Sequence, residues 1–290
     1  MPTTENPLSL ILDTDIGDDI DDTLALALIL NSPELELRGI TTVFINSARR
    51  AQLARKVLSV WNRADVPVTA GCSLPLLQPL TQGVGRQLQD FDLPQAEVPL
   101  PHSVDFLVQS LEEKWPILAI GPLTNVALAL AREPRLAEKT RLIMMGGQGP
   151  QGERREWNIH CDPEAAAMVF RSGIEIWQIG YDVTSQVRLS DTHLARIASE
   201  NNPRAELLAR LIRLWQNGKD ALPVLHDPLA VLALVTDCIQ FQEMDASVEL
   251  CGDKRGMFCY SAPRASHIHV AVSVDAPRAI DIFMQRILSD

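Results

Sequence analysis

The sequence predicts an α/β fold, a single domain in which a mostly parallel open sheet is flanked by helices. Short apolar segments rich in β-branched residues alternate along the chain with segments whose apolar residues recur at helical spacing. This alternation is typical of a parallel sheet covered on both faces. No linker or internal repeat interrupts it, so one domain over residues 1–290 is expected. Polar clusters follow several of the strands, at the end of the sheet where such folds bind ligands.

The first two thirds of the chain carry the clearest alternation. Short apolar runs predict strands, and apolar residues three or four apart predict helices. The expected strands are Ser9–Asp13, Leu37–Phe44, Val66–Ala70, Ile117–Ile120, Leu142–Met145 and Ile174–Ile179. The expected helices are Asp21–Leu30, Ala48–Asn62, Ser103–Lys114, Asn125–Ala131 and Pro163–Arg171.

The pattern becomes less regular after Tyr181. His226-Asp227-Pro228 is expected to cap a helix over Leu229–Val235, because Asp followed by Pro is typical of a helix start. The other elements expected here are one or two helices over Ser190–Trp215 with a break at Asn201-Asn202-Pro203, a loop over Asn217–Val224, and late strands over Ser247–Cys251 and His267–Val274.

Composition narrows the possible partners and compartments. The formal net charge of −11 argues against non-specific binding to nucleic acid or to an anionic membrane surface, both of which favour Lys/Arg-rich surfaces. No apolar stretch approaches the ~20 residues of a membrane span, and the N-terminal apolar run is too short for a signal peptide. The 5 cysteines have no Cys-x-x-Cys spacing, which argues against a disulfide framework or a zinc cluster. Reduced thiols and a cytoplasmic location are therefore expected.

An acidic turn lies between the first strand and the first helix. It contains Asp13, Asp15, Asp18, Asp19, Asp21 and Asp22. Carboxylates this close to a core repel one another, and some take up protons unless they share a cation. Ligands that are all oxygen suit Ca²⁺ or Mg²⁺ rather than zinc. The alternative is a solvated acidic helix start, where Asp is favoured, but the apolar flanks argue against an exposed loop.

Two known acidic motifs share features with this turn. An EF-hand does not fit, because Leu24 stands where its bidentate Glu should be. A strand followed by Asp13-x-Asp15 also fits an aspartyl phosphatase, with Asp13 as the nucleophile and Asp15 as the acid. Gly17 replaces the Thr or Val of that motif, and that class does not account for the later Asp21-Asp22 pair.

Further motifs follow in a fixed order along the chain. They are GITTVFIN ending at Asn46, IGPLTN ending at Asn125, MGG ending at Gly147, EWNIHCDPEAA beginning at Glu156, and HDPLA beginning at His226. Together with the acidic turn, this order resembles the inosine–uridine-type nucleoside N-ribohydrolases, from about Leu10 to about Val235. The resemblance implies a Rossmann-like fold of the nucleoside hydrolase type. It also implies Ca²⁺-dependent hydrolysis of a ribonucleoside to ribose and free base.

The resemblance implies a metal site. Its ligands would be Asp15, Asp22, the backbone carbonyl of Thr124, and Asp227. Asp15 would also act as the base that takes a proton from the attacking water. A chelated Ca²⁺ suits this reaction because it orients hydroxyl groups and lowers the pKa of a bound water.

The resemblance implies a ribose site beside the metal. Its members would be Asp21, Asn46, Glu156 and Asn158. Trp157 lies between two of these residues and is a candidate for an apolar wall, with an ordinary core tryptophan as the alternative. His226 would lie near the base and help it leave, with a helix-capping or supporting histidine as the alternative.

The chain departs from the family pattern in three places. Asp18 and Asp19 are two extra residues, so the assignment of the following Asp-Asp pair depends on where the gap is placed. Arg154-Arg155 precedes the EWN motif, as an exposed pair or as a site for an anionic substituent. Gln82-Gly83 stands near the position of a His-Gly pair that contacts the base in some members. It falls in Thr81–Pro101, a Gln-, Gly- and Pro-rich segment expected to be a mobile loop near the site.

Two further expectations rest on the resemblance. Relatives are commonly dimers or tetramers, so a homodimer or homotetramer is expected, with a small ribonucleoside as the partner of the site. A relative that binds calcium or a nucleoside without turnover stays open as an alternative. The nucleobase preference is not predicted.

Overall fold

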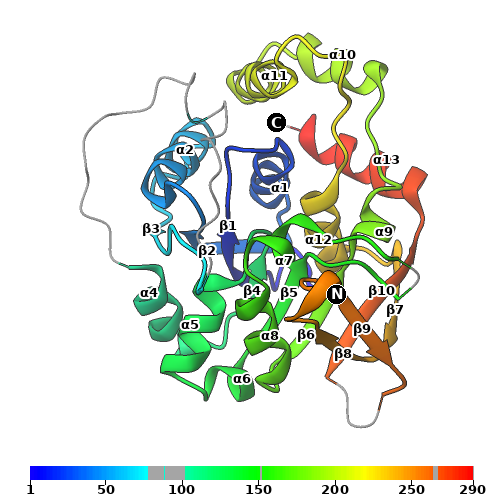
Figure 1. The fold of residues 1–290 in the computed structure, drawn as a ribbon. Helices are drawn as coiled ribbons and strands as arrows, with labels where there is room; N and C mark the ends of the chain where they lie inside the picture. Colours follow the sequence, from blue (N-terminus) through cyan, green and yellow to red (C-terminus); the bar gives the residue numbers. More distant parts are fainter. Residues whose placement is uncertain (78–87, 89–101, 151, 264–266, 290) are drawn as a thin grey trace.

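An eight-stranded sheet forms the centre of the computed structural model, which describes residues 1–77, 88, 102–150, 152–263 and 267–289 (Figure 1). The strand order is β3-β2-β1-β4-β5-β6-β10-β7, and the sheet is parallel except for β7. The strands are β1 (Leu8–Thr14), β2 (Leu35–Thr42), β3 (Val68–Ala70), β4 (Ile117–Ala119), β5 (Arg141–Met145), β6 (Glu175–Ile179), β7 (Ile239–Glu243) and β10 (Ile268–Val274). A separate hairpin pairs β8 (Asp245–Val248) with β9 (Phe258–Ser261).

The order of the strands creates a crevice beside β1. The chain runs from β1 outward to β2 and β3, then returns to place β4 on the other side of β1. Loops that follow β1 and β4 therefore leave in opposite directions, and ligands of open α/β sheets bind at such a switch point. The acidic turn follows β1 and the IGPLTN motif follows β4, so both lie at this point.

Helices cover both faces of the sheet, each over its own apolar core. One face is covered by α1 (Asp21–Leu30), α2 (Ser47–Val60), α11 (Pro203–Gln216), α12 (His226–Val235) and α13 (Ala276–Ile287). The other face is covered by α4 (Ser103–Gln109), α5 (Thr124–Arg132) and α8 (Pro163–Arg171). The remaining short elements are η1 (Ser110–Glu113), α6 (Leu136–Lys139), α7 (Trp157–Cys161), α9 (Tyr181–Thr184), α10 (Asp191–Ser199) and η2 (Gly252–Lys254).

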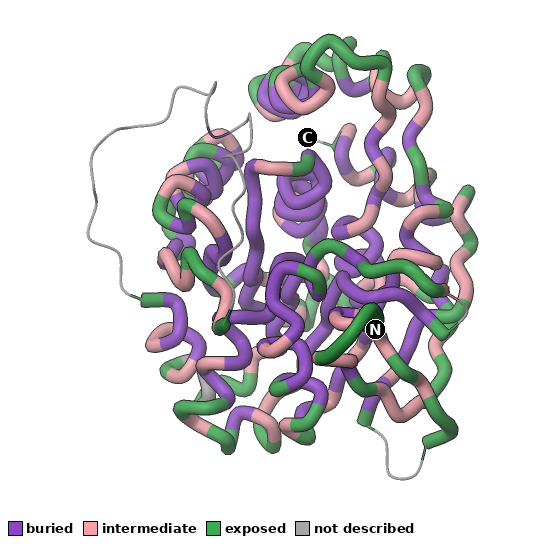
Figure 2. Tube along the Cα trace, viewed as in Figure 1, coloured by how far each residue is buried: buried purple, intermediate pink, exposed green. Residues whose placement is uncertain are grey.

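Helix α1 is buried on all sides, as Figure 2 shows, and α12 is buried except at His226, Ala233 and Val235. Of the ten residues of α1, all but Leu30 are buried. Both helices are apolar around their whole circumference, and a helix of that kind is stable only inside a protein. They pack against each other, and each begins with acidic residues. These carboxylates are thus held by two rigid elements inside the molecule. No described helix is long and apolar enough to span a membrane.

The predicted fold class is confirmed, and most of the strands and helices predicted up to Arg171 form with small shifts at their ends. The helix predicted over Ser103–Lys114 is instead α4, which ends at Gln109, followed by the 3-10 helix η1. The expected break before Pro203 is also confirmed, because Asn202 caps α11 through a hydrogen bond to the backbone N–H of Ala205. The strand expected over Ser247–Cys251 was placed too late, since β8 covers Asp245–Val248.

The prediction for the start of α12 was wrong. His226-Asp227-Pro228 does not cap the helix, because His226 is already its first residue and Leu225 is the N-cap without a side-chain hydrogen bond. Pro228 is tolerated because the first turn of a helix has no acceptors for its N–H groups. Asp227 is therefore free to face the acidic turn. The sequence patterns also missed β7, β9 and α13. Of the expected loop Thr81–Pro101, all but Leu88 lies outside the described residues.

Candidate active site

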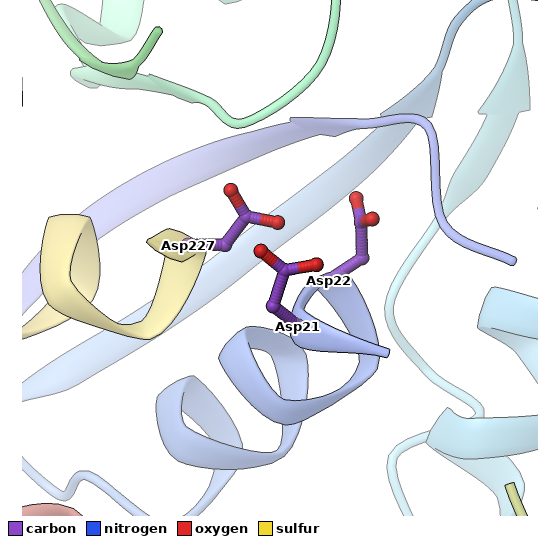
Figure 3. A group of neighbouring side chains, drawn as sticks. All are labelled: Asp21, Asp22 and Asp227. Carbon is purple, nitrogen blue, oxygen red and sulfur yellow. The ribbon is translucent and has the colours of Figure 1, made fainter. Parts of the chain in front are cut away.

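Three carboxylates from two helices meet at the carboxyl end of β1 (Figure 3). Asp21 and Asp22 begin α1, and Asp227 lies in the first turn of α12. One oxygen from each lies within 4.8 Å of the others, and all three residues are buried. Asp22 is oriented from below by the hydroxyl of Thr14, which donates to its Oδ1 at 2.5 Å. The fold therefore brings residue 227 next to residues 21 and 22.

The electrostatics of this cluster call for a cation. Burial raises the pKa of Asp21, Asp22 and Asp227 well above the usual range, and repulsion between the carboxylates raises each further. Burial likewise raises the pKa of Asp15 to about 7, although the nearby Arg50 guanidinium lowers it. A divalent ion would offset both effects, because it replaces the lost hydration and favours the charged carboxylates. The donors are all oxygen, so the cluster fits a hard cation such as Ca²⁺ or Mg²⁺.

The loop after β4 closes tightly over Asp15. A Cβ on Gly121 would lie 2.8 Å from Asp15 Oδ1 and 2.9 Å from its backbone nitrogen. No real Cβ contact is that short, so only glycine fits here. Thr124 follows at the start of α5, where its hydroxyl donates to Asp162 at 2.6 Å. The IGPLTN motif thus shapes the floor around Asp15 through its backbone.

Asp13 lies beneath the site rather than in it. Its Oδ1 accepts hydrogen bonds from Thr41 Oγ1 at 2.5 Å and from Asn125 Nδ2 at 2.8 Å. Burial raises its pKa to about 7, with these two hydrogen bonds opposing the shift. Asp13 is not among the described residues that line the cavity above it. A fully buried carboxylate cannot meet a phosphate ester, which argues against the aspartyl phosphatase.

Arg50 is a site-forming residue that the sequence patterns missed. It is 1% exposed, and its guanidinium pairs with the carboxylate of Asp18 at 2.7 Å. It also donates to the backbone carbonyls of Asp15, Ile16, Phe44 and Ile45. The signal was present, because Arg50 lies on the face of the predicted helix that also carries Ala54 and Val57. A cation on that apolar stripe required a buried anionic partner.

The two extra aspartates, Asp18 and Asp19, both lie at the rim of the cavity. Asp18 is the partner of Arg50, and Asp19 is an exposed residue whose carboxylate accepts from the backbone N–H of Ile20 at 2.6 Å. Both line the cavity beside the metal-type cluster. Helix α1 begins at Asp21, so Asp21 and Asp22 are the pair at the helix start.

Glu156 and Asn158 project into the site from the loop before α7 and from its first turn. Glu156 is the N-cap of α7 and accepts backbone N–H groups from Gly147, Asn158 and Ile159 at 2.8, 2.9 and 3.1 Å. Burial raises its pKa, and these hydrogen bonds oppose the shift. The amide nitrogen of Asn158 donates to the carbonyls of Ile120 and Met145. Both of its donor hydrogens are thus used, which leaves its oxygen as an acceptor for a ligand.

Aromatic and basic side chains line the other side of the cavity. Trp157 is 44% exposed, so it is not an ordinary core tryptophan. His226 stacks on Tyr181, with ring centroids 5.3 Å apart, and its Nδ1 lies 2.7 Å from Thr184 Oγ1. Burial, together with the positive charges of nearby arginines, lowers the pKa of His226 to about 4. His226 is therefore a neutral imidazole at pH 7.

The whole cavity has a volume of about 680 Å³, which is in the range for a small-molecule site. It is lined by all but two of the predicted site residues: Asp15, Asp21, Asp22, Glu156, Trp157, Asn158, His226 and Asp227. Arg154 and Arg155 line it as well, while both remain exposed. Asn46 and Thr124 are not among its described lining residues. Asn46 is exposed and has a left-handed backbone (φ 61) at the N-cap of α2.

Solved structures with this fold place the protein in the class of nucleoside hydrolases, enzymes that cleave N-glycosyl bonds. A plant nucleoside hydrolase, PpNRh1, superposes with a TM-score of 0.87 at 26% identity, over 98% of this chain and 100% of that one. A purine-preferring ribonucleoside hydrolase from Gardnerella vaginalis superposes with a TM-score of 0.86 at 28% identity, over 97% and 98%.

The chain belongs to the inosine-uridine preferring nucleoside hydrolase family, whose model matches residues 10–281. The non-specific ribonucleoside hydrolase RihC of Salmonella paratyphi A is 36% identical over 263 residues, which are 85% of each chain. The enzyme of the same name from Salmonella agona is 38% identical over 244 residues, 79% of this chain and 78% of that one. The suspected family is thereby confirmed.

Proposed function

We propose that the protein hydrolyses the N-glycosidic bond of ribonucleosides to ribose and free base, with Ca²⁺ as its metal. The observation that carries the proposal is the buried cluster of Asp21, Asp22 and Asp227, whose ligand oxygens lie within 4.8 Å of one another. Asp15 lines the same cavity. The names of the Salmonella relatives support a ribonucleoside substrate without a fixed base.

The proposed metal ligands are Asp15, Asp22, Asp227 and the backbone carbonyl of Thr124. The burial and mutual repulsion of the carboxylates support their assignment as metal ligands, whereas the assignment of Thr124 rests on the family resemblance. A Ca²⁺ ion bound here would hold the ribose hydroxyls and lower the pKa of a water. Ca²⁺ is favoured over Mg²⁺ because it accepts irregular sets of carboxylate and carbonyl ligands, whereas Mg²⁺ requires near-ideal octahedral geometry.

The chain's own residues would act on both reactants. Asp15 lines the cavity, and in the charged form that a bound divalent ion favours it can accept a proton from the attacking water. Asp21, Glu156 and the free amide oxygen of Asn158 can accept hydrogen bonds from ribose hydroxyls. Asn46 would join them only if the ligand reaches beyond the cavity wall.

The carboxylates also favour the reacting sugar. Cleavage of an N-glycosidic bond builds positive charge on the ribose ring, and fixed carboxylates around the ring stabilise that charge. Trp157 would form an apolar wall of the site. His226 would contact the departing base through the ring nitrogen that Thr184 does not hold.

The test is an assay of free base and reducing sugar. The protein is incubated with purine and pyrimidine ribonucleosides, with Ca²⁺ and with a chelator. Base release that needs the metal is expected. Asp227→Asn should abolish it, whereas the exposed Asp220→Asn should not. Failure to release base from any ribonucleoside would refute the proposal. Stabilisation of the protein by a ligand without formation of product would favour a non-catalytic binding protein. Release of phosphate from a phosphate ester would favour a phosphatase.

Domain organisation, oligomeric state and cellular location remain predictions. The whole chain acts as one catalytic domain, the protein assembles as a homodimer or homotetramer, and it works in the cytoplasm. Sedimentation equilibrium would test the second, and fractionation of cells that contain the protein would test the third.

A further inference from the structure

Most of the charged side chains that line the cavity are negative. Its described lining includes seven carboxylates, those of Asp15, Asp18, Asp19, Asp21, Asp22, Glu156 and Asp227. Arg154 and Arg155 are the only lysine or arginine side chains in that lining. Such a field favours a positively charged sugar but opposes a base that leaves with a negative charge. A positive group close to the base would relieve this conflict.

Arg154 is held by an aromatic column rather than by a carboxylate. Its guanidinium carbon lies 4.6 Å from the centroid of the Tyr181 ring, and its Nη1 donates to Tyr181 Oη at 2.9 Å. Tyr181 in turn stacks on His226. All three side chains line the cavity. The column therefore carries a permanent positive charge to the side of the site where His226 stands.

Arg155 has a different orientation. Its guanidinium donates to the backbone carbonyl of Asp253, in the turn η2 between β8 and β9. Among the described residues, the side chain of Arg154 has one hydrogen-bond partner, Tyr181. A guanidinium has five N–H donors, so Arg154 retains donors for a ligand. The Tyr181 hydroxyl accepts from Arg154, and its own hydrogen is left to donate.

We propose that Arg154 and Tyr181 stabilise the departing base, an inference that rests on the proposed function. In this step the bond between the ribose C1′ and the base nitrogen breaks, and its electron pair leaves with the base. The water oxygen bonds to C1′ and its proton passes to Asp15. Arg154 and the Tyr181 hydroxyl donate hydrogen bonds to the electron-rich base, which later takes a proton from solvent. Arg154 is thus a catalytic residue for poor leaving groups.

The test compares leaving groups. Inosine and uridine release poor ones, whereas p-nitrophenyl β-D-ribofuranoside releases a phenolate that needs no stabilisation. Arg154→Gln is expected to lower kcat for the two nucleosides by about 10- to 100-fold, at or below the range for loss of one oxyanion donor. The same variant should change kcat for the aryl riboside by less than about 3-fold. Tyr181→Phe keeps the ring, so a smaller loss with the same dependence on the leaving group is expected.

The exposed Arg196→Gln is the matched control, because it removes an equal charge from helix α10, whose residues do not line the cavity. Equal losses on all three substrates would overturn the inference and assign Arg154 to sugar binding or folding. Unchanged kcat for the nucleosides would overturn it as well. If the unmodified protein releases neither base nor p-nitrophenol, the proposed function fails and the inference falls with it. Activity of the unmodified protein with no effect of Arg154→Gln refutes the inference alone.

Discussion

Arg50 Nη2 lies 2.7 Å from Asp18 Oδ2, and this ion pair ties the acidic turn to helix α2. The Arg50 side chain is 1% exposed and that of Asp18 27% exposed. The same guanidinium holds the backbone carbonyl of Asp15. One buried cation therefore fixes the path of the chain next to the proposed catalytic base.

Replacing Arg50 should unfold this turn. Arg50→Met is expected to lower the free energy of unfolding by about 3–5 kcal/mol, because it leaves a partly buried carboxylate and several carbonyls without their donor. Urea denaturation measures the change. The exposed pair of Arg38 and Glu36 offers a control, since Arg38→Met should cost about 0–1 kcal/mol. A loss for Arg50→Met as small as that of the control would contradict the structural role given to Arg50.

Removing one carboxylate from the cluster should separate metal binding from folding. The metal-free Asp227→Asn variant is expected to melt at the same temperature as the unmodified protein or higher, because a repelling buried charge is gone. Saturating Ca²⁺ at about 100 times its Kd should stabilise the unmodified protein by about 2.7 kcal/mol and the variant hardly at all. Thermal melts with Ca²⁺ and with a chelator test this, and Asp220→Asn should behave as the unmodified protein. A variant that Ca²⁺ stabilises fully would remove Asp227 from the ligand set.

The stability of the metal-free protein should fall as pH rises. Burial raises the pKa of Asp13 and of Asp15 from 3.8 to about 7. Between these values the folded chain keeps protons that the unfolded chain has released. The contribution of these protons to the free energy of unfolding is therefore complete below about pH 4 and is lost as the pH rises through about 7. The free energy of unfolding falls by up to ~1.4 kcal/mol per pH unit for each group.

Chemical denaturation at pH 5, 6, 7 and 8 with a chelator measures this slope. Asp13→Asn should make the slope shallower, because the amide does not titrate and one contributing group is lost, while Asp15 still contributes. Saturating Ca²⁺ should flatten it too, since the ion binds the charged form of the cluster. Stability of the metal-free protein that does not change over this range would show that these carboxyl groups titrate normally.

A methyl group on Gly121 should disturb Asp15 without unfolding the protein. The added Cβ would lie within 3 Å of two Asp15 atoms, one of them in the backbone. Gly121→Ala is expected to lower kcat by about 100-fold, the cost of misplacing a reacting group by about 1 Å. Gly173→Ala is the control, because open space would surround the added Cβ. Its positive φ (+84) makes the substitution lower stability, but kcat should not change. Normal turnover by Gly121→Ala would mean that Asp15 is not held in place by this contact.

Much of the fold was predictable because its signals are local. Apolar runs and helical spacing identified β1, α1 and the alternation that follows, and the density of carboxylates in the acidic turn indicated a cation site. Elements near the C-terminus were harder. Strand β7 has the sequence IQFQE, in which Ile239 and Phe241 alternate with glutamines, so a short period-two strand signal was present and was missed. It is an edge strand with one neighbour, so burial does not require it to be apolar.

Other features depended on residues far apart in the chain. The acidic turn contains six aspartates, and no local rule states which of them face a metal. Asp18 pairs with Arg50, Asp13 pairs with Asn125, and Asp21 and Asp22 meet Asp227. Each of these contacts depends on how the strands are ordered and how the helices pack.

By itself the sequence determined the class of fold, the reaction family and the place of the acidic turn after β1, because these follow from periodicity and from motifs in order along the chain. The tertiary structure decided which carboxylates share one space and that Arg154 stands over Tyr181 beside His226. The physical reason is that charge and hydrogen bonding act through short distances in space. The crossover from β3 back to β4, and the packing of α12 against α1, create those distances between residues that are far apart in the sequence.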